Sequence, residues 1–141
     1  MLKILLSVDG SANSSRALDH VLALSAAGAQ LEIHLLNVQL PIASGHVTLF
    51  VTQNQINQYL RDEGLKALQP ARDRLDRSGV LYSYHIGVGN VADTIAEYAK
   101  ERHCDNVVMG TRGLSGWSNL LLGSVATKVL KLSPAPVTLV K

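Results

Sequence analysis

Hydrophobic residues along the chain gather in five short aliphatic runs, and longer amphipathic stretches separate these runs. The runs have the length and the Val, Ile and Leu content of buried strands. They cover residues 2–8, 31–38, 80–88, 106–110 and 137–141. The pattern therefore predicts five strands.

Four helices are predicted between the strands, because apolar residues recur there at three- and four-residue spacings. The first carries Ala17, Leu18, Val21, Leu22 and Leu24 and ends near Gly28. The second, from about Gln53 to Ser78, carries Ile56, Leu60, Leu68, Ala71 and Leu75 on one face. The third follows the N-cap Asn90 and turns Val91, Ile95, Tyr98 and Ala99 inward. The fourth carries Leu121, Leu122, Val125, Val129 and Leu132. Pro70 is expected to kink or split the second helix.

Strict alternation of strands and helices is typical of an α/β domain, in which helices cover both faces of a parallel sheet. Ligands bind such sheets at the carboxyl ends of the strands, where the strand order reverses. The segments predicted at these ends are residues 8–10, 38–39, 87–90 and 109–110. We expect one domain over residues 1–141.

Composition excludes several classes of function. The net charge of +2 is too small and too scattered for nucleic-acid binding. No apolar run approaches the roughly 18 residues that span a bilayer, so no membrane segment is expected. The single cysteine, Cys104, fits the reducing cytoplasm, where we expect the protein to act. Cys104 is expected to be a structural thiol, because no general base can be assigned to it.

The stretch "GTRGLSGWSNLLLGS", residues 110–124, is the strongest candidate for a binding site. It joins the fourth strand to the fourth helix, and its glycines suggest that the backbone approaches something closely. A helix N-terminus offers free N–H groups and partial positive charge, which suit a phosphate. The alternative is a plain connecting loop with Ser118 or Ser124 as N-cap. The residues alone leave both open.

The spacing G-x2-G-x9-G-[S/T] in this stretch resembles the nucleotide motif of the universal stress protein family. The segments "ILLSVDGSANSSRAL", "VVMGTRG" and "GSVATKVLKLSPAPVTLVK" resemble other parts of the family, so the resemblance covers the whole chain. It implies an open five-stranded parallel sheet of order 3-2-1-4-5, a Rossmann-like fold that binds adenine nucleotides. ATP or AMP would be the ligand, with Mg²⁺ accompanying the triphosphate.

The resemblance also implies a set of ligand residues. Val8, Asp9 and Val38 would surround the adenine, and Met109 and Gly110 would lie near the ribose. Gly113, Gly123, Ser124, Val125 and Ala126 would line the phosphate path. Some family members carry a hydroxyl residue where this chain has Ala126, which weakens the case for a triphosphate over AMP, cyclic nucleotides or dinucleotides.

Two residues of this region keep alternative interpretations. Asp9 either contacts the ligand or caps the first helix, and Arg112 either touches a phosphate or lies in a solvated turn. No catalytic residue and no metal site are predicted, because the five histidines form no motif with metal-ligand spacing. The motif "GVGNVA", residues 87–92, is interpreted as a tight turn with Asn90 as N-cap. The apolar loop 39–51 either packs on the sheet or forms a flap.

The last strand, from Val137 to Lys141, is expected at a sheet edge, where apolar strands invite pairing. Family members commonly dimerise through it, so a homodimer is predicted. The favoured function is an adenine-nucleotide-binding regulatory module in a stress response, with unknown protein partners. The alternatives are a slow Mg²⁺-dependent ATPase or phosphotransferase that uses Asp9, and a flavin or redox protein.

Overall fold

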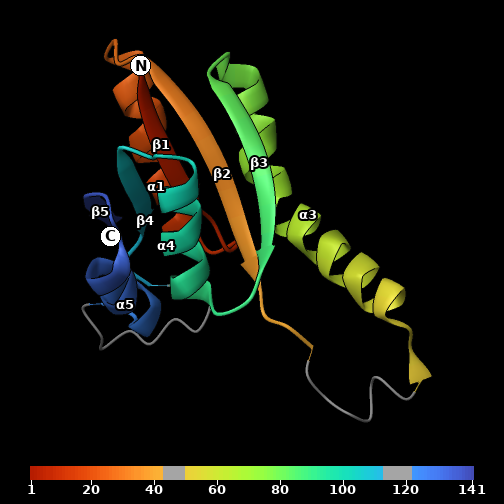
Figure 1. The fold of residues 1–141 in the computed structure, drawn as a ribbon. Helices are drawn as coiled ribbons and strands as arrows, with labels where there is room; N and C mark the ends of the chain where they lie inside the picture. Colours follow the sequence, from red (N-terminus) through yellow and green to blue (C-terminus); the bar gives the residue numbers. More distant parts are fainter. Residues whose placement is uncertain (43–49, 113–121) are drawn as a thin grey trace.

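A computed structural model describes residues 1–42, 50–112 and 122–141 of the chain. Its sheet is parallel and has the strand order β3-β2-β1-β4-β5 (Figure 1). The strands are β1 (Leu2–Ser7), β2 (Leu31–Gln39), β3 (Leu81–Val88), β4 (Asn106–Gly110) and β5 (Val137–Val140). The predicted fold class is confirmed, and the strand bounds differ from the predicted ones by no more than one residue.

Within the described residues, four helices connect the strands. They are α1 (Ala12–Ala26), α3 (Gln53–Ser78), α4 (Val91–Glu101) and α5 (Ser124–Leu132). Side chains cap the first three: Ser11 accepts from the backbone of Ser14, Thr52 forms a capping box with Gln55, and Asn90 accepts from Asp93. These capping hydrogen bonds mark the first residues of α1, α3 and α4, and they confirm Asn90 as the N-cap in the turn "GVGNVA".

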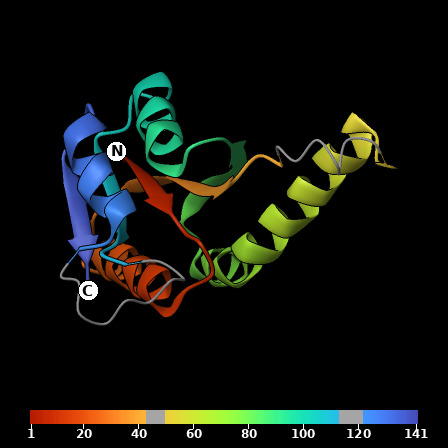
Figure 2. The ribbon, with the colours of Figure 1, turned by 90° about the horizontal axis from the view of Figure 1, so that it is seen from below.

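The helices lie on both faces of the sheet (Figure 2). One apolar core joins the sheet to α1 and α3 and includes Ala17, Leu18, Val21, Leu68, Ala71 and Leu75. The other joins the opposite face to α4 and α5 and includes Ala92, Ile95, Ala99, Ala126 and Val129. The buried centres of β1 and β4, residues 4–6 and 107–109, lie between the two cores, which explains why these segments are continuously apolar instead of alternating.

Several predictions about the helices are wrong in detail. Pro70 does not split α3, which continues through it as one helix. The missing N–H is tolerated because Pro70 and Lys66, whose carbonyl loses its helical partner, are both exposed to water. Leu24 and Leu132 were expected inward but are 37% and 43% exposed at the ends of their helices. Leu121 lies outside the described residues.

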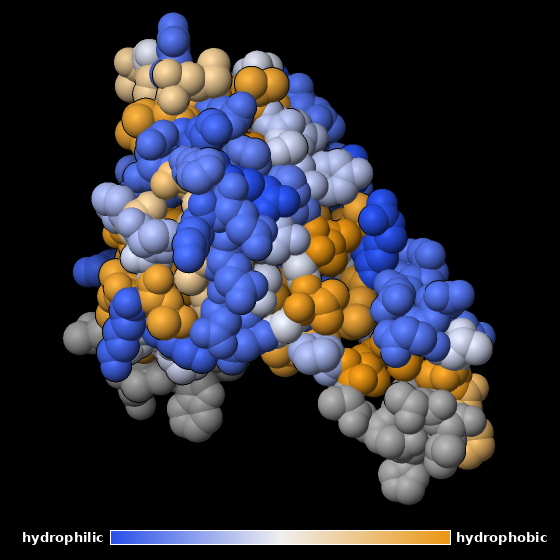
Figure 3. All heavy atoms as spheres, viewed as in Figure 1, coloured by the Kyte–Doolittle hydropathy of each residue, from blue (hydrophilic) through white to orange (hydrophobic). Residues whose placement is uncertain are grey.

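The N-terminal part of α3 projects beyond the sheet, and apolar surface lies between this arm and the body (Figure 3). The arm meets the sheet at Gly64, where an added Cβ would lie 2.7 Å from Cγ2 and 2.9 Å from Cγ1 of Ile86. Since Ile86 is β-branched and stiff at χ1, α3 can approach β3 this closely only with glycine at position 64.

We predict that Gly64→Ala destabilises the protein by about 1–2 kcal/mol, although alanine is the better helix former by roughly 1 kcal/mol. The free energy of unfolding in urea measures the effect. In an Ile86→Ala background the obstructing atoms are absent, so Gly64→Ala should become neutral or stabilising. Destabilisation of the same size in both backgrounds would contradict this account of the contact.

Candidate functional site

A cavity of about 230 Å³ opens at the carboxyl ends of β1 and β4, the two central strands where the strand order reverses. Parallel α/β sheets bind their ligands at this position. The described residues that line it are Ser7, Val8, Asp9, Ser14, Asn37, Val38, Val91, Met109, Gly110, Thr111, Arg112, Gly123, Ser124, Val125 and Ala126.

The structure brings together ten of the eleven residues predicted as nucleotide ligands: Val8, Asp9, Val38, Met109, Gly110, Arg112, Gly123, Ser124, Val125 and Ala126. Gly113, the eleventh, and Ser118 lie outside the described residues, as does most of the loop 39–51. The lining residues that sequence reasoning missed are Ser7, Ser14, Asn37, Val91 and Thr111. Shared position does not test a role in binding, so the ligand assignments stay predictions at this point.

Asp9 lies half-buried at the cavity wall. Its Oδ1 accepts a 2.9 Å hydrogen bond from the N–H of Ser11, and its own N–H donates to Ser14 Oγ at 3.3 Å. The N-cap of α1 is Ser11, so the interpretation of Asp9 as that cap is wrong. The turn between Asp9 and Ser11 instead holds the carboxylate at the cavity.

Asn37 forms the polar floor of the cavity at the end of β2 and is only 3% exposed. Its Nδ2 donates to the carbonyl of Val8 at 2.9 Å, and its Oδ1 accepts from Gln39 Nε2 at 2.7 Å. The amide thus fixes the end of β1 against β2. Its position as a polar residue near the carboxyl end of β2, where ligands of parallel sheets bind, was the sequence signal for it.

The N-terminus of α5 faces the cavity with Ser124, Val125 and Ala126. Its N-cap is Gly123, so this helix, unlike α1, α3 and α4, begins without a hydrogen bond from a capping side chain. The first N–H groups of a helix have no partner within it and carry partial positive charge. This end of the cavity is therefore suited to an anion.

Asn13, on the first turn of α1, ties the two ends of the glycine-rich loop to the sheet. Its Oδ1 accepts from the N–H of Arg112 at 2.8 Å and from Thr111 Oγ1 at 3.3 Å. The carbonyl of Thr111 in turn accepts from the N–H of Gly123 at 2.7 Å. Asn13 thus holds residue 112 directly, and Thr111 links it to residue 123.

Gly110 lies against the same residue. A Cβ at Gly110 would lie 2.9 Å from Asn13 Cβ and 3.0–3.1 Å from its backbone C and O. The backbone does approach something closely here, as the sequence suggested, but the neighbour of Gly110 is helix α1. Glycine at this position is explained by packing and does not require a ligand.

Positive charge is sparse at the cavity. Arg112 is the only basic side chain among the described residues that line it. Two basic side chains outside this lining have partners of their own: Arg16 Nε donates to the carbonyl of Lys141 at 2.8 Å, and Lys128 Nζ lies 3.3 Å from Asp93 Oδ2. The backbone N–H of Arg112 donates to Asn13 Oδ1, and the residue is half-buried in the lining of the cavity.

The remaining reactive side chains lie away from the cavity. Cys104 is buried, and this burial raises the pKa of its thiol, so it remains protonated and unreactive, as expected for a structural thiol.

Within residues 1–42, 50–112 and 122–141, no group of three or more His, Cys, Asp or Glu is placed to hold a metal ion. In the same residues no helix has both the length and the apolar content needed to cross a membrane.

Comparison with known proteins gives a consistent result. The model of the family described as "Universal stress protein family" matches residues 1–141. Universal stress protein YxiE of Bacillus subtilis is 34% identical, over 99% of this chain and 98% of the relative. The solved structure of MJ0577, a universal stress protein of Methanocaldococcus jannaschii, superposes with a TM-score of 0.86 at 30% identity, covering 99% and 95% of the two chains. A universal stress protein crystallised with cAMP superposes with a TM-score of 0.69 at 28% identity, covering 99% and 97%.

We predict that Asn13→Leu, which keeps the side-chain volume but removes the acceptor, destabilises the protein by about 1–3 kcal/mol, because the N–H of Arg112 is left without a partner. Chemical denaturation measures the loss. Asn57→Leu on the exposed face of α3 is the matched control and should change stability by less than about 0.5 kcal/mol. Equal effects at the two positions would contradict the role of Asn13.

Proposed function

The chain belongs to the universal stress protein family, and we propose that it binds an adenine nucleotide in the cavity between β1 and β4. One observation carries the proposal: residues from four separate segments, predicted as ligands from the motif, line a single cavity at the reversal point of the sheet. The bound cAMP of the related structure supports an adenine nucleotide as the ligand class.

The lining of the cavity combines the two kinds of chemistry that a nucleotide requires. Val8, Val38 and Val91 contribute apolar surface, which suits a flat base. Arg112, Gly123 and Ser124, with the N-terminus of α5, contribute groups that suit a phosphate. Asp9 lies where its carboxylate could accept hydrogen bonds from a ribose or an adenine amino group.

We infer a regulatory role in a stress response, in which the ligand state of the cavity is read by a partner. A binding function needs no catalytic base, and ATP, AMP and cyclic nucleotides all share the chemistry just described. The alternative, a slow Mg²⁺-dependent ATPase or phosphotransferase, needs positioned cations around the phosphates. Arg112 is the only cation that the described lining offers, so no specific observation favours that alternative.

A homodimer through β5 completes the proposal. β5 lies at the edge of the sheet, where its outer backbone groups are open to pairing. The carbonyls of Pro136 and Val140 accept hydrogen bonds from β4, and the alternation along a strand then turns the N–H of Leu139 away from β4. A second copy can add its own β5 at this edge in an isologous interface.

Isothermal titration of nucleotide-free protein with AMP, Mg-ATP and GTP tests the nucleotide proposal. We expect saturable binding with a preference for adenine. Gly123→Val should weaken binding at least tenfold, about 1.4 kcal/mol, because its side chain would start 3.3 Å from the carbonyl of Thr111 and crowd the N–H groups of α5.

Leu130→Val, exposed on the same helix and outside the cavity lining, controls for the effect of a β-branched residue. Thermal denaturation of both variants verifies that they are folded. Absence of binding at millimolar AMP and ATP by the unchanged protein would refute the proposal. A folded Gly123→Val variant with unchanged affinity would refute the assignment of the phosphate path.

Sedimentation velocity at micromolar concentration tests the dimer. We expect the unchanged chain to sediment as a dimer and Leu139→Pro to sediment as a monomer, because proline removes an N–H that β4 does not use. Thr127→Ala, an exposed position on α5 away from the edge, should leave the dimer intact. A monomer for the unchanged chain would show that the edge of β5 remains unpaired.

A further inference from the structure

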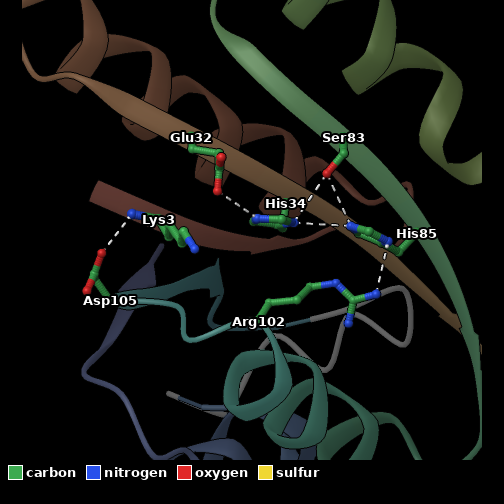
Figure 4. A network of polar contacts seen from close by, with 7 residues as sticks. All are labelled: Lys3, Glu32, His34, Ser83, His85, Arg102 and Asp105. Atoms are coloured by element: carbon green, nitrogen blue, oxygen red, sulfur yellow. Dashed lines mark hydrogen bonds and ion pairs between the residues drawn. The ribbon is translucent and has the colours of Figure 1, made fainter. Parts of the chain in front are cut away.

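A chain of four polar side chains crosses from β2 over β3 to the end of α4, away from the nucleotide cavity (Figure 4). Glu32 and His34 come from β2, His85 from β3, and Arg102 from the C-cap of α4. Glu32 and His34 lie on the same side of β2 as Leu36, and Leu36 belongs to the core under α4. The four side chains therefore lie on the face of the sheet that α4 covers. No sequence motif marks this cluster, because its two histidines are 51 residues apart in the chain.

The contacts run without a break from the carboxylate to the guanidinium. Glu32 Oε2 lies 3.1 Å from His34 Nε2, and His34 Nδ1 lies 3.2 Å from His85 Nε2. His85 Nδ1 lies 3.4 Å from Arg102 Nη2. The planes of the two imidazole rings make an angle of 19°, and the ring centroids are 5.4 Å apart. Ser83 Oγ is 3.2 Å from each of the two facing ring nitrogens.

The two end groups determine where every proton in the chain lies. A guanidinium can only donate, and a carboxylate can only accept. Arg102 therefore donates to His85 Nδ1, His85 donates from Nε2 to His34 Nδ1, and His34 donates from Nε2 to Glu32. Both imidazoles are neutral in this arrangement, and each carries its proton on Nε2.

One added proton cannot be accommodated without losing a contact. A proton on His85 Nδ1 faces the N–H of Arg102. A proton on His34 Nδ1 forces His85 to give up its Nε2 proton and carry one on Nδ1, which again faces Arg102. If His85 keeps its proton on Nε2, this N–H faces the N–H at His34 Nδ1. The two nitrogens are 3.2 Å apart, and only Ser83 Oγ is there to accept these hydrogens.

We propose that the His34–His85 pair is a proton-binding site that acts as a latch: in its neutral form it holds Arg102 at the end of α4 to the edge strand β3, and proton uptake releases that link. The released guanidinium has alternative contacts within reach. Its Cζ already lies 4.2 Å from the centre of the Tyr98 ring, and its Nη1 lies 3.7 Å from Glu101 Oε2. This proposal does not rest on nucleotide binding.

The charges around the pair favour the neutral form of His85. Burial, then Arg102, then His34 lower the pKa of His85 from 6.5 to about 4. Glu32 on β2, Glu101 on α4 and Asp105 after α4 are acidic groups near the pair, and Lys3 on β1, opposite Glu32 in the register, adds a positive charge. Tyr98 and the buried thiol of Cys104 are further titratable groups that α4 and its C-terminal turn contribute.

The sign of the pH dependence follows from this lowered pKa. The unfolded chain binds a proton at His85 more readily than the folded chain between pH 6.5 and about 4. Stability is therefore complete above this window and is lost as the pH falls through it. The loosened elements are β3, which is an edge strand, and the C-terminal end of α4.

Nitrogen-15 NMR of the histidine rings and of Arg102 between pH 8 and 4, with amide hydrogen exchange corrected for intrinsic rates, tests the latch. We expect both rings to report one coupled transition, the Arg102 Nε signal to shift with it, and exchange of β3 amides to rise at least tenfold. Independent titration of the two rings, or no acid transition in β3 exchange, would overturn the proposal.

Two substitutions separate the latch from a merely structural contact. Arg102→Lys keeps a group that can only donate, so the transition should stay at the pH of the unchanged protein. Arg102→Gln offers an amide oxygen that can accept from a protonated His85, so the pair should take up its proton at a higher pH. His103→Asn is the control. His103 is exposed, and Asn tolerates its φ of 51°, so this variant should change neither the NMR transition nor the exchange of β3 amides. Equal transitions in Arg102→Lys and Arg102→Gln would contradict the model.

Discussion

The site depends on one close approach, that of helix α1 to the end of β4. The backbone of Asn13 lies against Gly110, and the side chain of Asn13 accepts hydrogen bonds from the two residues that follow Gly110. This contact brings the start of α1, the end of β4 and, through Thr111, the start of α5 to one point. The cavity is the space left between these three termini and the end of β1, so its shape follows from how tightly they are held.

The electrostatics of this cavity come from backbone more than from charged side chains. Within the described lining, Asp9 and Arg112 are the only charged side chains, whereas α5 directs its uncapped N-terminus at the same space. Fixed backbone dipoles need no reorganisation when an anion arrives. An anion at this point would therefore meet mainly the backbone N–H groups at the start of α5.

The opposite end of α4 carries a second kind of polar chemistry. Arg102 can only donate hydrogen bonds and Glu32 can only accept them, so these two groups determine the direction of every hydrogen bond between them. The pair of imidazoles in the middle is therefore sensitive to a single added proton. Val91, at the start of α4, lines the cavity, and Arg102 follows the last turn of this helix. One helix therefore runs from the cavity proposed to bind a nucleotide to the histidine pair proposed to bind a proton.

The amino-acid sequence by itself determined the strands, the helices and the α/β class, because short, mostly apolar strand segments alternate along it with amphipathic helical segments. The strand order and the predicted ligand set came from the glycine spacing and its family resemblance, and local signals such as Asn90 located helix starts. Tertiary structure alone decided that α3 continues through Pro70, that Ser11 and not Asp9 caps α1, and that Gly110 faces a helix. It also decided that Asn13 meets Arg112 and that His34 meets His85. These contacts join residues 99 and 51 positions apart, and the distances between them depend on how the layers pack, which periodicity along one chain does not encode.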